Sequence, residues 1–167
     1  MDYKYYERKL NDIIQKCPIE AGVEILVYNV LDSIVELKGL SLVDINRIWR
    51  SKDKRLSTSA GVPDIAVLSD DFVFKSNIGQ ALGFIEVKAT NKTLSETKQV
   101  KGQKSATNHY IYTNGLVWKY YENKKLKWDI ALDSYKRPSI IVKNVRVLLE
   151  EKEFKNLLIK LNDINWK

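Results

Sequence analysis

Three charged residues lie where the sequence otherwise predicts hydrophobic strands. Asp64 follows Pro63 directly before a run of apolar residues, and Glu86 and Lys88 interrupt a second apolar run. Because side chains alternate between the faces of a strand, Glu86 and Lys88 must point the same way. Removing such charges from water is unfavourable unless something compensates, and a bound cation is one such compensation. The pattern therefore indicates a metal-dependent site.

The spacing of these charges also indicates a chemistry. If the strands expected over 63–69 and 82–90 pair, Asp64 can face Glu86. Two carboxylates at that distance repel each other, and Mg²⁺, with Mn²⁺ as a substitute, would remove the repulsion. Lys88 would then place a fixed positive charge where it can orient a water molecule or stabilise a pentacovalent phosphate. We therefore expect hydrolysis of a phosphodiester.

The elements that must position these residues follow from hydrophobic periodicity and turn residues. The apolar residues of 19–37 recur at helical spacing, and Asn114-Gly115 is a favourable hairpin turn. The expected helices are 3–16, 19–37, 94–105 and 147–162. The expected strands are 42–50, 63–69, 72–75, 82–90, 109–113, 116–122 and 126–132. This order predicts an α/β fold, a central mixed β-sheet flanked by helices, in one domain over residues 1–167.

Composition narrows the classes of function. The chain has 167 residues, 44% of them hydrophobic, which excludes a disordered or fibrous protein. A single cysteine, Cys17, and a single histidine, His109, argue against a disulfide framework and a Cys- or His-built metal site. We expect a cytoplasmic protein without a membrane partner, because no apolar run approaches the length of a membrane span. The net charge of +7 favours a polyanion such as nucleic acid as the partner.

Two motifs carry a resemblance to a known family. Pro63-Asp64 and Glu86-x-Lys88 resemble the signature of the PD-(D/E)xK nuclease superfamily. Downstream, Gln99 and the segment 113–121, which reads T-N-G-x-x-W-x-x-Y, are similar to the N-terminal nuclease domain of type I restriction motor subunits. The resemblance covers roughly residues 19–122 and implies a restriction-endonuclease-like fold.

The resemblance also implies roles for particular residues. Asp64 and Glu86 match the metal-binding carboxylates, Lys88 the catalytic lysine and Gln99 a further catalytic residue. Family members often carry an acid on the first core helix, for which Glu24 is the better match and Glu20, one turn earlier, the fallback. The restriction-type pattern usually reads Q-x-x-x-Y, but Gln103 stands at the tyrosine position.

A cluster of basic and hydroxyl residues precedes the Asp64 motif and is suited to phosphate contacts. We expect DNA-backbone binding from Arg47, Arg50, Lys52, Lys54, Arg55 and Ser59.

The sequence thus predicts a Mg²⁺-dependent DNA endonuclease of restriction or defence type, acting as a homodimer or within a larger restriction complex. Two related alternatives are a catalytically inactive nuclease-fold module that binds DNA or assembles with a partner, and a structure-selective nuclease like the Holliday junction resolvases. An RNA-binding module is a third. The simplest structural alternative makes Glu86-x-Lys88 an exposed ion pair on an edge strand and Asp64 a turn residue.

Overall fold

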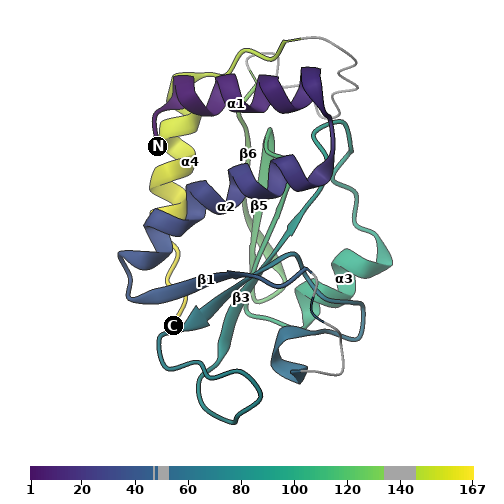
Figure 1. The fold of residues 1–167 in the computed structure, drawn as a ribbon, viewed down its shortest axis with the longest axis vertical. Helices are drawn as coiled ribbons and strands as arrows, with labels where there is room; N and C mark the ends of the chain where they lie inside the picture. Colours follow the sequence, from purple (N-terminus) through teal and green to yellow (C-terminus); the bar gives the residue numbers. More distant parts are fainter. Residues whose placement is uncertain (47, 49–52, 134–145) are drawn as a thin grey trace.

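A computed structural model describes residues 1–46, 48, 53–133 and 146–167 of the chain (Figure 1). Arg47, Arg50 and Lys52 lie outside the described residues. The described helices are α1 (Tyr3–Lys16), α2 (Glu20–Glu36), α3 (Lys98–Ser105), α4 (Glu151–Asn162) and a short 3₁₀ helix, η1 (Lys54–Leu56). The described strands are β1 (Leu40–Asp44), β2 (Ile65–Ser69), β3 (Ala81–Val87), β4 (His109–Thr113), β5 (Val117–Glu122) and β6 (Lys125–Ala131).

The strands form one six-stranded sheet in the order β1-β2-β3-β4-β5-β6. Neighbouring strands are antiparallel except β3 and β4, which are parallel and are joined through α3. A parallel pair needs a crossover connection, and α3 supplies it. The predicted fold class is therefore confirmed: the protein is α/β, with a mixed sheet flanked by four α-helices among the described residues.

Each face of the sheet has its own hydrophobic core. Helices α1, α2 and α4 cover one face, and their apolar residues pack with inward-facing residues such as Ile65, Ile85 and Trp118. On the other face, Val100 of α3 packs against Phe84, Tyr110 and neighbouring side chains. Burial on both faces explains why β2 and most of β3 read as continuous apolar runs rather than as alternating ones.

Caps and turns set the ends of the elements that carry the site. Pro18 separates α1 from α2, so that Glu20 is the first residue of α2. The hydroxyl of Thr97 accepts a hydrogen bond from the Val100 amide at 3.2 Å, and α3 therefore begins at Lys98 rather than at residue 94. The turn between β4 and β5 contains Gly115 at φ +82°, a conformation that favours glycine.

The strand expected over 72–75 is wrong. These residues lie in the connection between β2 and β3, where Phe74 and Lys75 are in a turn and Lys75 has φ +60°. The physical reason is that the Val73 carbonyl accepts a hydrogen bond from the Arg55 side chain instead of from another strand. Arg55 also donates to the carbonyls of Ile78 and Gly79 later in the same connection. In the strand expected over 42–50, β1 ends at Asp44 and Asn46 is in a turn, while residues 47, 49 and 50 lie outside the described part of the chain.

Candidate metal and phosphodiester site

The pairing of β2 with β3 places Asp64 beside Glu86. Ile65 is opposite Ile85 in the antiparallel register, and the Asp64 amide donates to the Ile85 carbonyl at 3.2 Å. The Asp64 side chain is held as well, because its Oδ2 accepts a hydrogen bond from the Val87 amide at 2.6 Å. The carboxylate before β2 and the carboxylate in β3 are therefore fixed to the same part of the sheet.

Glu86 is the most buried of the site carboxylates, with 1% of its surface exposed. Its Oε1 accepts hydrogen bonds from Lys88 Nζ at 2.7 Å and from Gln99 Nε2 at 3.0 Å. Its Oε2 is buried and has no hydrogen-bond partner among the described residues. A buried carboxylate oxygen without a partner is unfavourable, so this atom marks a place where a ligand would be stabilised.

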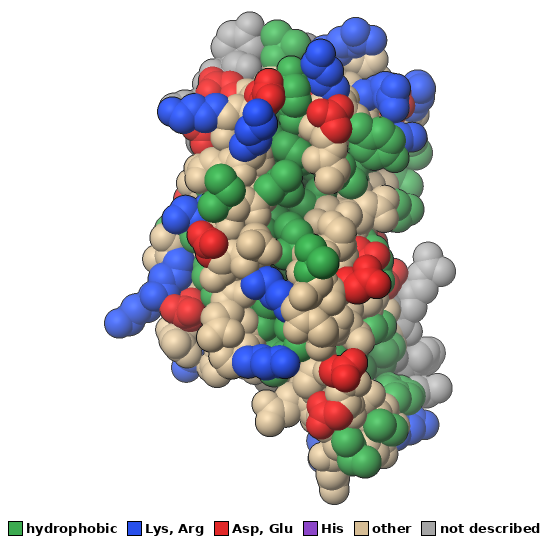
Figure 2. All heavy atoms as spheres, turned by 90° about the vertical axis from the view of Figure 1, so that its left-hand side faces the viewer, with side chains coloured by type: hydrophobic (Ala, Val, Ile, Leu, Met, Phe, Trp, Pro, Cys, Tyr) green, Lys and Arg blue, Asp and Glu red, His purple; other side chains and the backbone are tan. Residues whose placement is uncertain are grey.

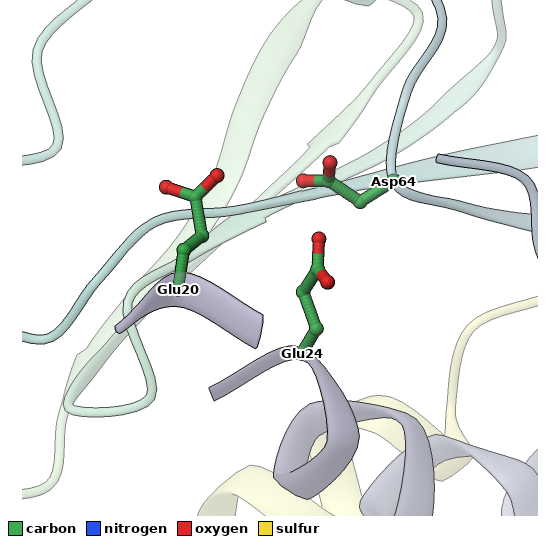
Figure 3. Close-up of side chains that lie close together, drawn as sticks. All are labelled: Glu20, Glu24 and Asp64. Carbon is green, nitrogen blue, oxygen red and sulfur yellow. The ribbon is translucent and has the colours of Figure 1, made fainter. Parts of the chain in front are cut away.

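Two acids from the first turns of α2 meet Asp64. The side chains of Glu20, Glu24 and Asp64 point toward one another (Figure 3), and one oxygen of each lies within 4.8 Å of the other two. Asn46 donates a hydrogen bond to Glu24 Oε1 at 2.7 Å, and Lys88 Nζ lies 3.7 Å from Glu20 Oε1. The acidic cluster therefore contains both α2 acids, not Glu24 alone.

The electrostatics of the cluster favour a cation. Burial, with repulsion from Glu86, raises the pKa of Asp64 to about 8, and burial with repulsion from Asp44 raises the pKa of Glu24. Burial works against the charged form of Lys88, but its hydrogen bond to Glu86 and the surrounding carboxylates outweigh this effect and raise its pKa. Oxygen donors crowded in this way are the ligands that Mg²⁺ takes, so the cluster Glu20, Glu24 and Asp64 can bind a metal.

The two glutamines of α3 have different surroundings. Gln99 reaches Glu86, whereas Gln103 is fully buried and its Oε1 accepts a hydrogen bond from the Tyr110 hydroxyl at 2.8 Å. Gln99 is therefore the glutamine that contacts the acidic site. Gln103 lies three residues after the buried Val100, on the same side of α3, and Val100 and Tyr110 belong to the hydrophobic core that α3 covers.

The described basic residues before Asp64 do not behave alike. Lys54 and Ser59 are exposed and can face a polyanion. Arg55 instead pairs with Asp53, with Nη2 2.7 Å from Oδ2, and its guanidinium stacks on the Phe72 ring at 4.0 Å. In this structure Arg55 joins η1 to the turn between β2 and β3. Contact of any of these residues with DNA stays a prediction.

Charge on one face of the molecule is mixed. Figure 2 views the left-hand side of Figure 1, and shows Lys and Arg interspersed with Asp and Glu around a band of hydrophobic side chains. A surface for the DNA backbone requires a concentration of positive charge. This face does not provide one.

Sequence reasoning ranked Glu20 below Glu24 and missed Asn46. The signal for Glu20 was present, because residues four apart on a helix share a face. Asn46 lies in a turn after β1, where no pattern in the sequence points to Glu24.

Comparison with known proteins identifies the fold. No family model matches the chain, and no curated protein matches it. A chain of the cryoEM structure of a DrdV–DNA complex matches with a TM-score of 0.58 and 16% sequence identity, covering 96% of this chain and 95% of that one. The similarity shows that the two chains share a fold over nearly their full lengths. No helix in the described part of the chain is long and apolar enough to cross a membrane.

Proposed function

We propose that this protein is a metal-dependent DNA endonuclease of the PD-(D/E)xK type. The observation that carries the proposal is the buried Glu86, whose Oε1 is held by Lys88 and Gln99 and whose Oε2 has no hydrogen-bond partner among the described residues. Asp64, which β2–β3 pairing fixes near Glu86, belongs to the carboxylate cluster with Glu20 and Glu24. The shared fold with a chain from a DNA complex supports DNA as the substrate. We also propose that the chain forms one domain and acts in restriction or defence. It would do so either as a homodimer or as part of a larger restriction complex.

In this proposal, Asp64 and Glu86 Oε2 hold the metal, and Glu24 or Glu20 completes the protein ligands. A bound Mg²⁺ polarises the phosphate and lowers the pKa of a water molecule. Gln99 fixes Glu86 Oε1 and thereby the direction in which Oε2 points. These residues need no large movement, because strand pairing and hydrogen bonds already hold Asp64 and Glu86.

Lys88 supplies the positive charge. Its ammonium group is bound by Glu86 and by the Val87 carbonyl at 2.8 Å, and about a quarter of the side chain remains exposed. The surrounding acids keep it protonated, so it donates hydrogen bonds rather than removing a proton. We propose that it orients the attacking water and stabilises the negative charge that develops on the phosphate oxygens.

Plasmid cleavage tests the proposal. Wild type, Asp64→Ala and Lys88→Ala are compared with Mg²⁺, with Mn²⁺ and with EDTA, and Glu36→Gln serves as control because Glu36 is an exposed acid at the far end of α2. We expect nicking by wild type and Glu36→Gln only with metal, and a loss of about 10²–10³-fold in both site variants. DNA binding by the wild type without nicking under any metal condition would leave the inactive DNA-binding module as the better conclusion.

Metal binding has its own measurement. Mg²⁺ or Mn²⁺ that binds the folded protein and not the unfolded chain raises its melting temperature, and the rise grows with the logarithm of the ratio of metal concentration to Kd. We expect the rise for wild type and Glu36→Gln and a smaller rise or none for Asp64→Ala. An equal rise in melting temperature in all three proteins would mean that the metal binds at a site that does not include Asp64.

A further inference from the structure

A polar cavity lies at the end of the sheet away from the carboxylates. It has a volume of about 830 Å³, within the range of small-molecule sites. Its walls come from the end of β2, the starts of β3 and β4, the end of β5 and residues 165–167. Leu82 lines it near the start of β3, whereas Glu86 lies near the end of that strand, roughly 13 Å away at about 3.3 Å per residue. The cavity is therefore separate from the proposed metal site.

Two buried aromatic rings form part of the cavity wall. His109 is 8% exposed and Trp166 is 3% exposed, with ring centroids 5.6 Å apart and planes at 62°. The Trp166 ring packs so closely on Gly83 that a Cβ there would lie 2.4 Å from it. The His109 ring is held by a second contact, because its Nδ1 lies 2.8 Å from the Tyr120 hydroxyl. The rings are thus fixed before any ligand arrives.

The polar part of the wall is rich in amides. The carboxamide side chains that line the cavity are Asn77, Gln80, Asn108, Asn123 and Asn165. Each offers a donor and an acceptor side by side, the arrangement that recognises the hydrogen-bonding edge of a heterocycle. The Trp166 Nε1 is a buried donor without a hydrogen-bond partner among the described residues.

The charges of the cavity disfavour an anion. Asp71 and Glu122 both line it, and Lys167 is the lysine among its lining residues. Glu122 already pairs with Lys127 at 2.7 Å. Burial lowers the pKa of His109, so its ring is neutral near pH 7 and adds no positive charge. A phosphate-rich ligand would therefore meet little compensation here.

We propose that this cavity binds a nucleobase, carried either by a free nucleoside or by an unpaired base of a nucleic acid. The donors and acceptors along the ring edge of a nucleobase match the paired donors and acceptors of the lining amides, and the exposed edges of His109 and Trp166 give the same wall an aromatic part. The proposal does not depend on metal binding or on cleavage of DNA.

Nuclear magnetic resonance of the ¹⁵N-labelled full chain in EDTA provides the test. Adenosine, guanosine, cytidine and thymidine are titrated separately to about 10 mM, a range that detects weak complexes near 1 mM. The indole signal of Trp166 is assigned from its absence in Trp166→Phe. We expect at least one nucleoside to shift this signal saturably while ribose alone leaves it unchanged.

Substitution of the exposed amides provides the matched variants. Asn108→Ala combined with Gln80→Ala removes two amides at solvent-exposed positions, and we expect affinity to fall about 3–10-fold or more. Asn162→Ala, an exposed amide at the end of α4 outside the cavity, should bind like the wild type. No saturable shift with any nucleoside, an equal shift with ribose, or unchanged affinity in the double variant would each overturn the proposal.

A short single-stranded DNA separates the two sources of the base. Binding of the strand at this cavity, with competition by the nucleoside, assigns an unpaired base as a ligand. Nucleoside binding that the strand does not displace assigns the free nucleoside. Strand binding that shifts Trp166 but that no nucleoside displaces would show that another part of the nucleic acid is recognised, contrary to the proposal.

Discussion

Two ion pairs of similar length have different surroundings in this molecule. Arg55 and Asp53 are 2.7 Å apart, as are Lys88 and Glu86. Arg55 also donates to three backbone carbonyls, and Asp53 Oδ2 accepts from the Lys75 amide at 2.9 Å. Around the second pair, by contrast, Glu86 Oε2 has no partner in the described part of the chain, and the nearby acid Asp64 is crowded by Glu20 and Glu24.

The pKa values of the acids follow the same division. The hydrogen bond with Arg55 holds the pKa of Asp53 far below its usual range, whereas burial and repulsion raise the pKa of Asp64 to about 8. The network around Arg55, in which the charged groups are hydrogen-bonded, stabilises a turn, whereas the crowded carboxylates Glu20, Glu24 and Asp64 can bind a cation. Both pairs contain a buried carboxylate. They differ because the polar atoms of Arg55 and Asp53 have hydrogen-bond partners, whereas Glu86 Oε2 has none among the described residues.

The largest expected effect is on catalysis, in Glu86→Gln. The amide keeps the shape of the side chain but removes the charge of the Oε2 position, so we expect cleavage to fall about 10²–10³-fold. The free energy of unfolding without metal should stay the same or rise, because one repelling carboxylate is gone. Cleavage and urea unfolding are measured on the same preparation. A strongly destabilised Glu86→Gln protein would make this pair structural too and remove the contrast.

The second largest effect that we expect is a loss of folding stability in the Asp53→Ala variant. This change leaves Arg55 and the Lys75 amide without their acceptor, and we expect a loss of about 2–4 kcal/mol in the free energy of unfolding. Denaturation in urea measures it. Asp32→Ala, at an exposed position of α2, is the control. Cleavage by the folded fraction should be retained; specific loss of activity without loss of stability would assign Asp53 to the site instead.

The third effect is a dependence of stability on pH in EDTA. The pKa of Asp64 is about 8 in the folded protein and near 4 in an unfolded chain, so the folded state holds a proton that the unfolded state releases. The free energy of unfolding should therefore fall as pH rises from about 4 to 8, by at most about 1.4 kcal/mol per pH unit from this group.

Asp64→Asn is the test of that assignment. It should flatten this part of the pH profile, and saturating Mg²⁺ should reduce the slope in the wild type because the metal takes the place of the proton. Urea unfolding at a series of pH values measures both. Parallel profiles for wild type and Asp64→Asn would mean that another group dominates.

The smallest effect separates the two glutamines. Gln99→Ala removes the hydrogen bond that fixes Glu86, and we expect about tenfold slower cleavage with little change in stability. Gln103→Ala leaves the buried Tyr110 hydroxyl without its acceptor, so we expect a loss of about 1–3 kcal/mol in stability and normal cleavage per folded molecule. The reverse result would exchange their roles.

Most of the fold was predictable because hydrophobic periodicity survives tertiary packing. The helix 3–16 and the strand 109–113 agree with α1 and β4 at both ends, and α2 differs by one residue at each end. The predicted elements that are wrong lie where side chains from another part of the chain determine the backbone conformation. Residues 72–75 have the apolar pattern of a strand, but the carbonyl of Val73 is taken by Arg55, a partner that no local pattern reveals.

The sequence by itself determined which residue types share a strand face, and hence that Glu86 and Lys88 point the same way; their side chains are 2.7 Å apart, although β3 ends at Val87. Period-two alternation is a property of the strand backbone and needs no knowledge of neighbours. Only the tertiary structure decided that Glu20 joins Glu24, that Gln99 rather than Gln103 reaches Glu86, and that Arg55 is engaged within the protein. Each of these depends on the relative placement of elements far apart in the chain, which side-chain packing and hydrogen-bond satisfaction set across the whole molecule.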